Sequence, residues 1–421
     1  MEDAELRKKG EYLFTKHVLD DAELKKEYDQ WLDVAKKLKE MEDKLNKGIS
    51  GMSDKDLAEF LKEWNKVHIN FWLTGFLPEL SNWGGELMLK RKLLKFDRKN
   101  FIEIFEKLSA PEEVSFFEKE QLELMRMKLM GPVEREKQFA VHQMRYYWIA
   151  NSYCTTRVLD EDWFRKQLSE ISEEEARRRI EEIESYAENV KEDKKEVIEK
   201  YSIPEDIVNI ADKLAYCVGW QDYRKTYIFI ANHMITQFVR EISRRNAIDF
   251  KELCYYTTEE IEELAEKGYK ADVKQRFEGF AEYYTERSGI SYFEGREAQD
   301  LARPYVEIDF DPGMKEFKGI VVSTGNRIKA KARVMMKPEP ESMEKGEVLI
   351  APMTSPDYVV AMRKAGAIVT DTGGMTCHAA IVSRELDVPC IVNTKFATKT
   401  ISTGDIIEVD TKKGIVRKVD Q

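Results

Sequence analysis

The first three hundred residues of the chain repeat a helical pattern of apolar and polar positions. Leu, Glu, Lys and Ala dominate this stretch and proline is rare, as is typical of long helices. Residues 173–200 are almost all charged, apart from a narrow apolar seam at helical spacing. Capping-box spacings mark three helix starts: Ser172-x-x-Glu175, Ser202-x-x-Glu205 and Thr257-x-x-Glu260. The pattern predicts a large all-α domain over residues 1–302.

The last hundred residues change to short apolar runs. The segment IKAKARVMM alternates apolar and charged residues, as a half-buried strand does. The runs GEVLIAPM, AGAIVTD, VPCIVN and GDIIEVD are bounded by Gly, Pro or Asp and predict buried strands. Helices are expected over residues 356–364 and 379–386. A compact β/α domain over residues 317–421 follows, so the fold class is α+β and multidomain.

The composition changes at the same place. Residues 311–421 carry 17 Lys and Arg against 14 Asp and Glu, whereas the preceding 310 residues carry 51 and 65. The tail also holds nine of the 21 glycines and six of the 11 prolines. We expect residues 303–316, which include Pro304 and Pro312, to form an extended, semi-rigid linker with hinges at its ends.

The overall charge and the apolar runs exclude several kinds of protein. The formal net charge of −11 argues against a nucleic-acid binder or a binder of anionic membranes, because both need a basic face. No uncharged apolar run approaches 18 residues, and the N-terminus has no apolar signal segment. Five scattered cysteines without a CxxC pair argue against a disulfide framework and a zinc site, so we expect a cytoplasmic protein without a bound metal.

Two aromatic-rich helices, expected over residues 134–159 and 207–245, carry polar stripes. One interpretation is an ordinary helix surface with buried aromatics behind it. The other is that the two stripes face each other and line a pocket for an acceptor, with arginines available for a phosphate or carboxylate. The residues of this possible acceptor pocket are His142, Arg145, Asp222, His233, Arg240 and Arg244.

The segment 370–393, TDTGGMTCHAAIVSRELDVPCIVN, carries the strongest chemical indication. Gly373 and Gly374 permit a tight turn after a strand, and His378 then falls at the start of an amphipathic helix. The positive end of a helix disfavours an imidazolium ion but suits a neutral imidazole that acquires a phosphoryl group. Thr376 can offer a hydroxyl to that phosphate. The alternative is that His378 is only a cap or a packed side chain.

The same segment closely resembles the phosphohistidine signature of the swivelling domain in phosphoenolpyruvate-utilising enzymes. That family includes phosphoenolpyruvate synthase, pyruvate phosphate dikinase and rifampicin phosphotransferase. The resemblance covers residues 317–418 and implies a β/β/α swivelling domain in which His378 is phosphorylated. It also places Gly373, Gly374, Thr376 and Arg384 at motif positions that support the phosphate.

The helical part departs from the family. It lacks a Gly-rich nucleotide loop and alternating strands, so we expect no ATP-grasp domain in it, and we expect no TIM barrel after residue 418. The resemblance therefore implies a phosphocarrier and acceptor component that works with a partner ATP-grasp protein. ATP and magnesium would bind to that partner, and His378 would pass the phosphoryl group to a hydroxyl or enol substrate. Two alternatives remain open, a regulatory protein that reports the state of a partner dikinase through His378, and a remnant that accepts no phosphate.

Overall fold

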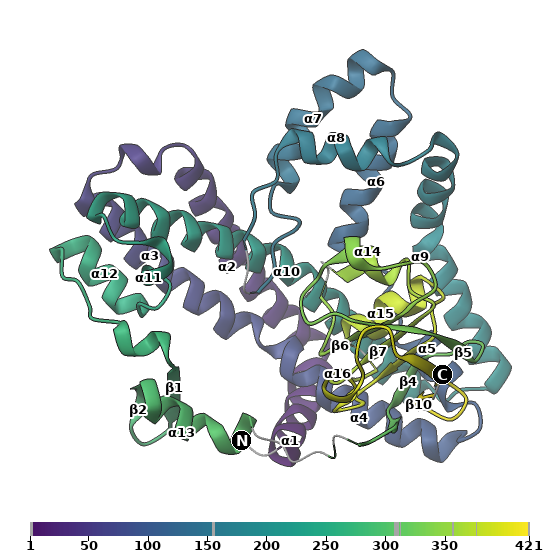
Figure 1. The fold of residues 1–421 in the computed structure, drawn as a ribbon. Helices are drawn as coiled ribbons and strands as arrows, with labels where there is room; N and C mark the ends of the chain where they lie inside the picture. Colours follow the sequence, from purple (N-terminus) through teal and green to yellow (C-terminus); the bar gives the residue numbers. More distant parts are fainter. Residues whose placement is uncertain are drawn as a thin grey trace. The chain divides into compact units, whose positions relative to one another are not determined.

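The computed structural model describes residues 3–153, 156–306, 311, 313–355, 358–375 and 377–419. The chain divides into two compact units, each built from segments that are distant in the sequence (Figure 1). The first unit comprises Met1–Asp33, Trp72–Phe229 and Pro312–Gln421, and the second comprises Val34–Phe71 and Ile230–Asp311. Compactness thus groups the histidine-bearing tail with helices from the first half of the chain, whereas the predicted domain limits follow the change in secondary structure.

Helices account for most of the first unit outside the tail. Its helices are α1 (Asp3–Leu13) with the π-turn Phe14–Val18, α4 (Leu77–Phe96), α5 (Phe101–Leu108), α6 (Phe116–Lys128), α7 (Pro132–Tyr146), α8 (Glu161–Ser169) and α9 (Glu173–Tyr201). The helices α2 (Asp21–Asn46), α3 (Asp54–Gly75) and α10 (Glu205–Asn246) each begin in one unit and end in the other. The backbones of α1 and α4 come into contact at Gly10 and Gly84. The contact requires glycine at position 84, since a Cβ there would lie 2.1 Å from the Gly10 carbonyl carbon.

The first of the two aromatic-rich helices is shorter than predicted. Helix α7 ends at Tyr146 instead of continuing to residue 159. The chain then forms tight turns in which the amide of Ile149 bonds to Tyr146 and that of Asn151 bonds to Trp148. The Asn151 side chain, which is buried, accepts the Arg157 N–H at 2.7 Å and donates to the Phe229 carbonyl at 3.1 Å. These bonds fix a non-helical path, so the predicted polar stripe ends with α7.

The predicted helix starts have three outcomes. Ser172 caps α9 by accepting the Glu175 N–H, and Thr257 forms a complete capping box with Glu260 at the start of α12 (Thr258–Lys267). Ser202 instead ends α9 in a left-handed conformation with φ of 52°, and α10 begins at Glu205. The second aromatic-rich helix is confirmed, since α10 spans the predicted range.

The second unit is not purely helical, which corrects the prediction for residues 1–302. Besides α11 (Phe250–Leu253) and α12, it contains the antiparallel hairpin of β1 (Phe280–Thr285) and β2 (Gly289–Glu294). Both strands are rich in aromatic residues, and Gly289 supplies the turn with φ of 69°. Helix α13 (Gly295–Val306) covers the first residues of the expected linker, and β3 (Glu316–Lys318) includes its last residue. Residues 307–310 and 312 lie outside the described residues, so an extended linker there stays a prediction.

The tail forms one mixed sheet of eight strands in the order β3-β10-β9-β5-β6-β7-β8-β4. Strands β5 to β8 are parallel and the other pairings are antiparallel. The bounds are β4 (Ile320–Ser323), β5 (Ile328–Val334), β6 (Val348–Ala351), β7 (Ala367–Thr370), β8 (Cys390–Val392), β9 (Ile406–Asp410) and β10 (Ile415–Lys418). Each predicted strand is present, and β6 and β7 are buried along their whole length.

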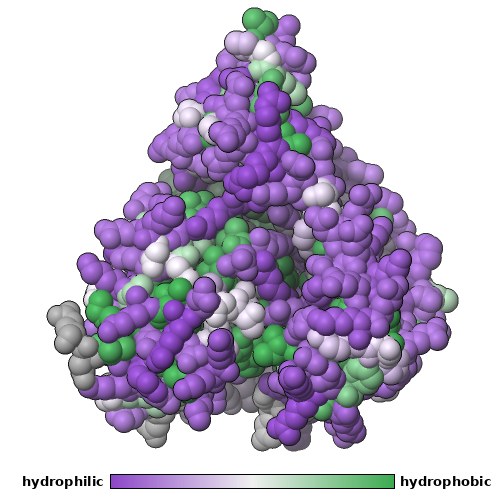
Figure 2. Space-filling view, turned by 90° about the vertical axis from the view of Figure 1, so that its right-hand side faces the viewer, coloured by the Kyte–Doolittle hydropathy of each residue, from purple (hydrophilic) through white to green (hydrophobic). Residues whose placement is uncertain are grey.

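Three short helices accompany this sheet: α14 (Val359–Met362), α15 (His378–Glu385) and α16 (Ala397–Thr400). Helix α15 packs against β4, β7 and β8, and α16 packs against β6 and β7. The observed fold class is therefore a large, mainly helical region followed by a β/α tail. The face drawn in Figure 2 is mostly hydrophilic, and among the described residues no helix is long and apolar enough to cross a membrane.

Candidate functional site

His378 is the first residue of α15, as the sequence predicts. Strand β7 ends at Thr370, a turn containing Gly373 and Gly374 follows, and Cys377 is the N-cap residue with φ of −72° and ψ of 164°. The parallel neighbour β6 ends at Ala351, and its following loop carries Thr354. Because parallel strands place their carboxyl ends at one edge of a sheet, the two loops meet there.

The imidazole ring is held from one side. Its Nδ1 lies 2.9 Å from the buried Thr354 hydroxyl, and among the described residues this is the hydrogen bond that the ring makes. When Nδ1–H donates to this hydroxyl, Nε2 carries the lone pair and is the nucleophilic nitrogen. The side chain is partly exposed, but burial, and then the charge of Lys225, lower the pKa of His378 to about 3. The ring is therefore neutral at physiological pH.

The turn before His378 is packed tightly. Gly373 has φ of 130°, and a Cβ there would lie 2.8 Å from the Cys377 sulfur. A side chain at position 373 would therefore be strained and would push the N-cap residue aside. Burial raises the pKa of the Cys377 thiol, so this residue is a packed side chain and a poor nucleophile.

Arg384 and Glu86 bind the carbonyl and the N–H of Met375, respectively. Arg384 Nε donates to the Val322 carbonyl at 2.9 Å, and its guanidinium also donates to the Met375 carbonyl. Glu86 of α4 accepts the Met375 N–H at 3.2 Å, and its carboxylate fills the space beside Gly374. Arg384 is thus placed to support the loop backbone, and a direct bond from it to a phosphate stays a prediction. Thr376 lies outside the described residues.

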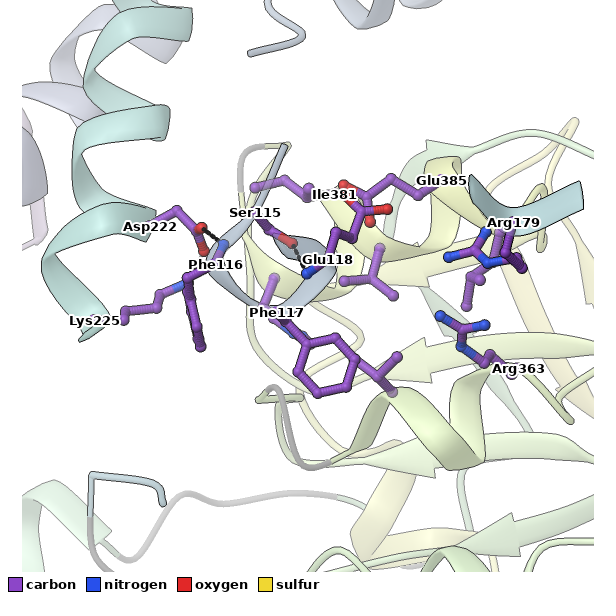
Figure 3. A pocket seen from close by; sticks show the side chains of 14 residues that line it. Ser115, Phe116, Phe117, Glu118, Arg179, Asp222, Lys225, Arg363, Ile381 and Glu385 are labelled. Carbon is purple, nitrogen blue, oxygen red and sulfur yellow. Dashed lines mark hydrogen bonds and ion pairs between the residues drawn. The ribbon is translucent and has the colours of Figure 1, made fainter. Parts of the chain in front are cut away.

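A cavity of about 60 Å³ adjoins His378. Its lining comes from α6, α9 and α10 and from α15 with the segment around α14, all within the first unit (Figure 3). Its apolar lining comes from Phe116, Phe117, Val359, Ile381, Val382 and Leu386. Its polar lining comes from Ser115, Glu118, Arg179, Asp222, Lys225, Arg363, His378 and Glu385.

The charges around the cavity perturb one another. Burial and the nearby Arg179 charge lower the pKa of Arg363. Burial raises the pKa of Glu118, and burial together with the like charges of Glu118 and Asp222 raises the pKa of Glu385 to about 8. Glu385 is an exposed residue, and water limits the size of its shift. Asp222 accepts the Phe116 N–H at 3.1 Å and pairs with Lys225 at 3.4 Å.

Of the predicted acceptor residues, Asp222 is the one that lines this cavity. In α7, the buried His142 ring lies 2.9 Å from Glu120, and Arg145 donates to Glu123 at 2.6 Å. The remaining three belong to the second unit: burial lowers the pKa of His233, Arg240 lies over the Phe250 ring, and Arg244 pairs with Glu241. A single pocket formed by all six residues stays a prediction.

Sequence reasoning missed most of the polar lining. Ser115 and Glu118 have the capping spacing that marked other helix starts, and Ser115 does cap α6 by accepting the Glu118 N–H. Arg179 lies in the charged segment 173–200, which resembles a solvated arm in sequence. Lys225 lies three residues after Asp222 in α10, so the sequence alone predicts that the two residues share a face of the helix. Arg363 and Glu385 line the cavity only because α14 and α15 pack there, and the sequence does not predict this packing.

Among the described residues, the potential metal ligands that come together are His17, Glu23 and Glu27, and they include no residue of the cavity. Asp371, the carboxylate after β7, is instead bonded by Thr394 and Thr398. These bonds stabilise the β7–α16 connection. The expected absence of a metal on this chain is an untested prediction.

Comparisons with known proteins find relatives of the tail. Residues 343–414 match the family model of the PEP-utilising enzyme, mobile domain. A probable phosphoenolpyruvate synthase of Archaeoglobus fulgidus is 41% identical over 151 residues, which are 35% of this chain and 19% of the relative. The phosphoenolpyruvate synthase of Pyrococcus furiosus is 54% identical over 80 residues, 19% of this chain and 10% of the relative. The tail is therefore a mobile, phosphohistidine-type domain of the PEP-utilising enzymes.

The match is confined to this part of the protein. The chain spans less than a fifth of the length of either relative. A solved structure of Enzyme I aligns over 73% of this chain and 82% of its own with 16% identity, but its TM-score of 0.21 is too low to support an argument. The activity of the whole protein is consequently a matter for proposal.

Proposed function

We propose that this chain carries a phosphoryl group on His378 and passes it to a hydroxyl or enol oxygen of a small molecule. It would be the phosphocarrier and acceptor component of a dikinase-type phosphotransferase. The observation that supports this most strongly is the placement of His378 at the start of α15, with Nδ1 bonded to Thr354 and the ring neutral. This arrangement leaves Nε2 with its lone pair at the positive end of a helix.

The phosphoryl donor is proposed to be ATP bound with magnesium to an ATP-grasp component, either a partner protein or another part of a larger assembly. Transfer to His378 would form the Nε2–P bond and break a P–O bond of the donor. The neutral imidazole needs no prior deprotonation, because its Nδ1 keeps the ring proton. In the second step the Nε2–P bond breaks, its electron pair returns to the ring, and a base must take the hydroxyl proton.

Radioactive labelling tests the first step. The full chain is incubated with a candidate ATP-grasp partner protein and with ATP labelled at the β or γ position, and separately with phosphoramidate, which needs no partner. We expect an acid-labile, base-stable label that His378→Gln abolishes. His17→Gln is the matched control, since this histidine lies far from the signature in sequence, and it should label like the wild type.

Two results would contradict the proposal in different ways. Full labelling of His378→Gln would show that another residue is the acceptor and would overturn the phosphocarrier function. Labelling of His378 that no hydroxyl compound discharges would favour the regulatory alternative, in which phosphorylation reports the state of a partner.

A further inference from the structure

Two arginines lie together at one end of the cavity beside His378. Arg179 comes from α9 and Arg363 follows α14, and Figure 3 shows their guanidinium groups one above the other. The Nε of Arg179 is buried and has no hydrogen-bond partner among the described residues, while another nitrogen of the same guanidinium donates to Glu182 at 2.9 Å. Two neighbouring guanidinium groups repel each other, and planar paired donors suit a carboxylate, so this end of the cavity favours a small anion.

A carboxylate lines the same cavity. Glu118 lies in the first turn of α6, and its Oε2 is buried without a hydrogen-bond partner among the described residues. An unpaired carboxylate oxygen in such a place is costly unless a ligand or a proton satisfies it. Burial raises its pKa, which makes Glu118 a better proton acceptor than an exposed glutamate.

Lys225 supplies a third cation from α10. It is close enough to His378 for its charge to lower the pKa of that ring. A phosphoryl group on the ring would bring negative charge toward this ammonium group. The cavity thus combines a phosphoryl site near Lys225, a buried carboxylate and a basic pair.

The size of the cavity restricts the ligand. A water molecule occupies about 10–15 Å³ by the same kind of measure, and a dry cavity that holds benzene has about 150 Å³. A cavity of about 60 Å³ therefore holds a group of a few non-hydrogen atoms, and a larger ligand would extend out of its open side.

From this geometry we infer that the cavity is the acceptor site and takes a small hydroxy carboxylate, with Glu118 as the catalytic base. The inference rests on the proposed function of His378. The acceptor's carboxylate binds between Arg179 and Arg363, and its hydroxyl lies between Glu118 and the phosphoryl group. The hydroxyl oxygen bonds to phosphorus as the Nε2–P bond breaks. The hydroxyl proton passes to Glu118, and His378 leaves as a neutral imidazole.

Binding to the unphosphorylated full chain tests the anion site independently of phosphorylation. Glycolate is the probe, and glycolamide, which has the same shape without the charge, is the matched ligand. We expect saturable binding of glycolate by calorimetry or NMR titration, and at least tenfold weaker binding of glycolamide. Arg363→Gln and Arg179→Gln should each weaken glycolate binding at least tenfold. Arg178→Gln is the control and should have no effect, because this exposed side chain shares the Glu182 partner of Arg179 but does not line the cavity.

Discharge of the phosphorylated protein tests the base. The chain is labelled with phosphoramidate and mixed with glycolate. Glu118→Gln should slow loss of the label about 100-fold or more while leaving the Kd for glycolate within a factor of about three, because the base acts on the proton and not on the carboxylate. The pH dependence of the wild-type discharge rate should be absent from this variant.

The outcomes separate the two proposals. If glycolamide binds as well as glycolate, if neither binds, or if Arg178→Gln weakens binding as much as Arg363→Gln, the acceptor site is wrong. If glycolate binds through Arg363 but leaves the label in place, the acceptor role is overturned although His378 remains a phosphocarrier. If His378 takes up no label, the proposed function fails, and the binding experiment still decides the anion site.

Discussion

His378 Nδ1 and the Thr354 hydroxyl lie 2.9 Å apart and join the loops that follow two neighbouring parallel strands, β6 and β7. The bond orients the ring, and in the tautomer whose Nδ1–H donates to the hydroxyl, Nε2 is free to attack. The position of the proposed nucleophile on one loop is therefore set by a residue that lies 24 positions earlier on another.

Replacing the Thr354 hydroxyl should slow phosphorylation of His378. Thr354→Val removes the bond and leaves the shape nearly unchanged, so we expect a fall in the labelling rate of about tenfold, which corresponds to about 1.4 kcal/mol. Thr354→Ser keeps the hydroxyl and should recover most of the rate. An unchanged rate in the valine variant, with the fold intact by circular dichroism, would show that the ring needs no such support.

A side chain at Gly373 should disturb both the loop and the fold. Gly373→Ala introduces a Cβ 2.8 Å from the Cys377 sulfur at φ of 130°. We expect a loss of about 1–3 kcal/mol in the free energy of unfolding, measured by urea denaturation, and a lower labelling rate. Gly131→Ala is the matched control, because nothing lies within 4 Å of its added Cβ. Equal stability of the two variants would contradict the strain that the structure indicates.

The Glu86 carboxylate should disfavour the phosphorylated state. It accepts the Met375 N–H at 3.2 Å in the turn that carries His378, so a dianionic phosphoryl group would add negative charge near it. Glu86→Gln keeps an acceptor and removes the charge. We expect this change to favour the phosphorylated state by about 1 kcal/mol, which corresponds to roughly fivefold more phosphorylated protein at equilibrium. Glu11→Gln is the control. Glu11 lies in α1 and pairs with Arg91 of α4, the helix that carries Glu86, so its replacement should leave the equilibrium unchanged.

The protein should lose stability in mild acid through His378. The pKa of this ring is about 3 in the folded chain against an ordinary 6.5, so the unfolded state binds the proton more readily. The resulting loss in the free energy of unfolding is absent above pH 6.5. It grows as the pH falls toward 3, by at most about 1.4 kcal/mol per pH unit. His378→Asn should show a shallower loss of stability between pH 6.5 and 4.5 in urea titrations. Other histidines whose pKa is lowered, such as His68, contribute to both proteins and cancel in the difference.

The secondary structure of the tail could be read from the chain because it rests on local chemistry. Short apolar runs, turn residues and the start of α15 at His378 all follow from which residues are adjacent. The hairpin at residues 280–294 was missed, since its strands lie in a region where helical patterns dominate. Helix α7 was overextended because the bonds that stop it come from Asn151, one of which reaches Phe229, 78 positions away.

The sequence by itself determined the place of His378 at the start of its helix, the glycine-rich turn and the class of domain, since these depend on a contiguous segment. It did not determine what surrounds the nucleophile. Thr354, Glu86, Glu118, Arg179 and Lys225 come from separate loops and helices, and only folding brings them to His378 or its loop. Burial in that setting also decides the charge of the ring and of the carboxyl groups, because a pKa depends on neighbours in space and not on neighbours in the chain.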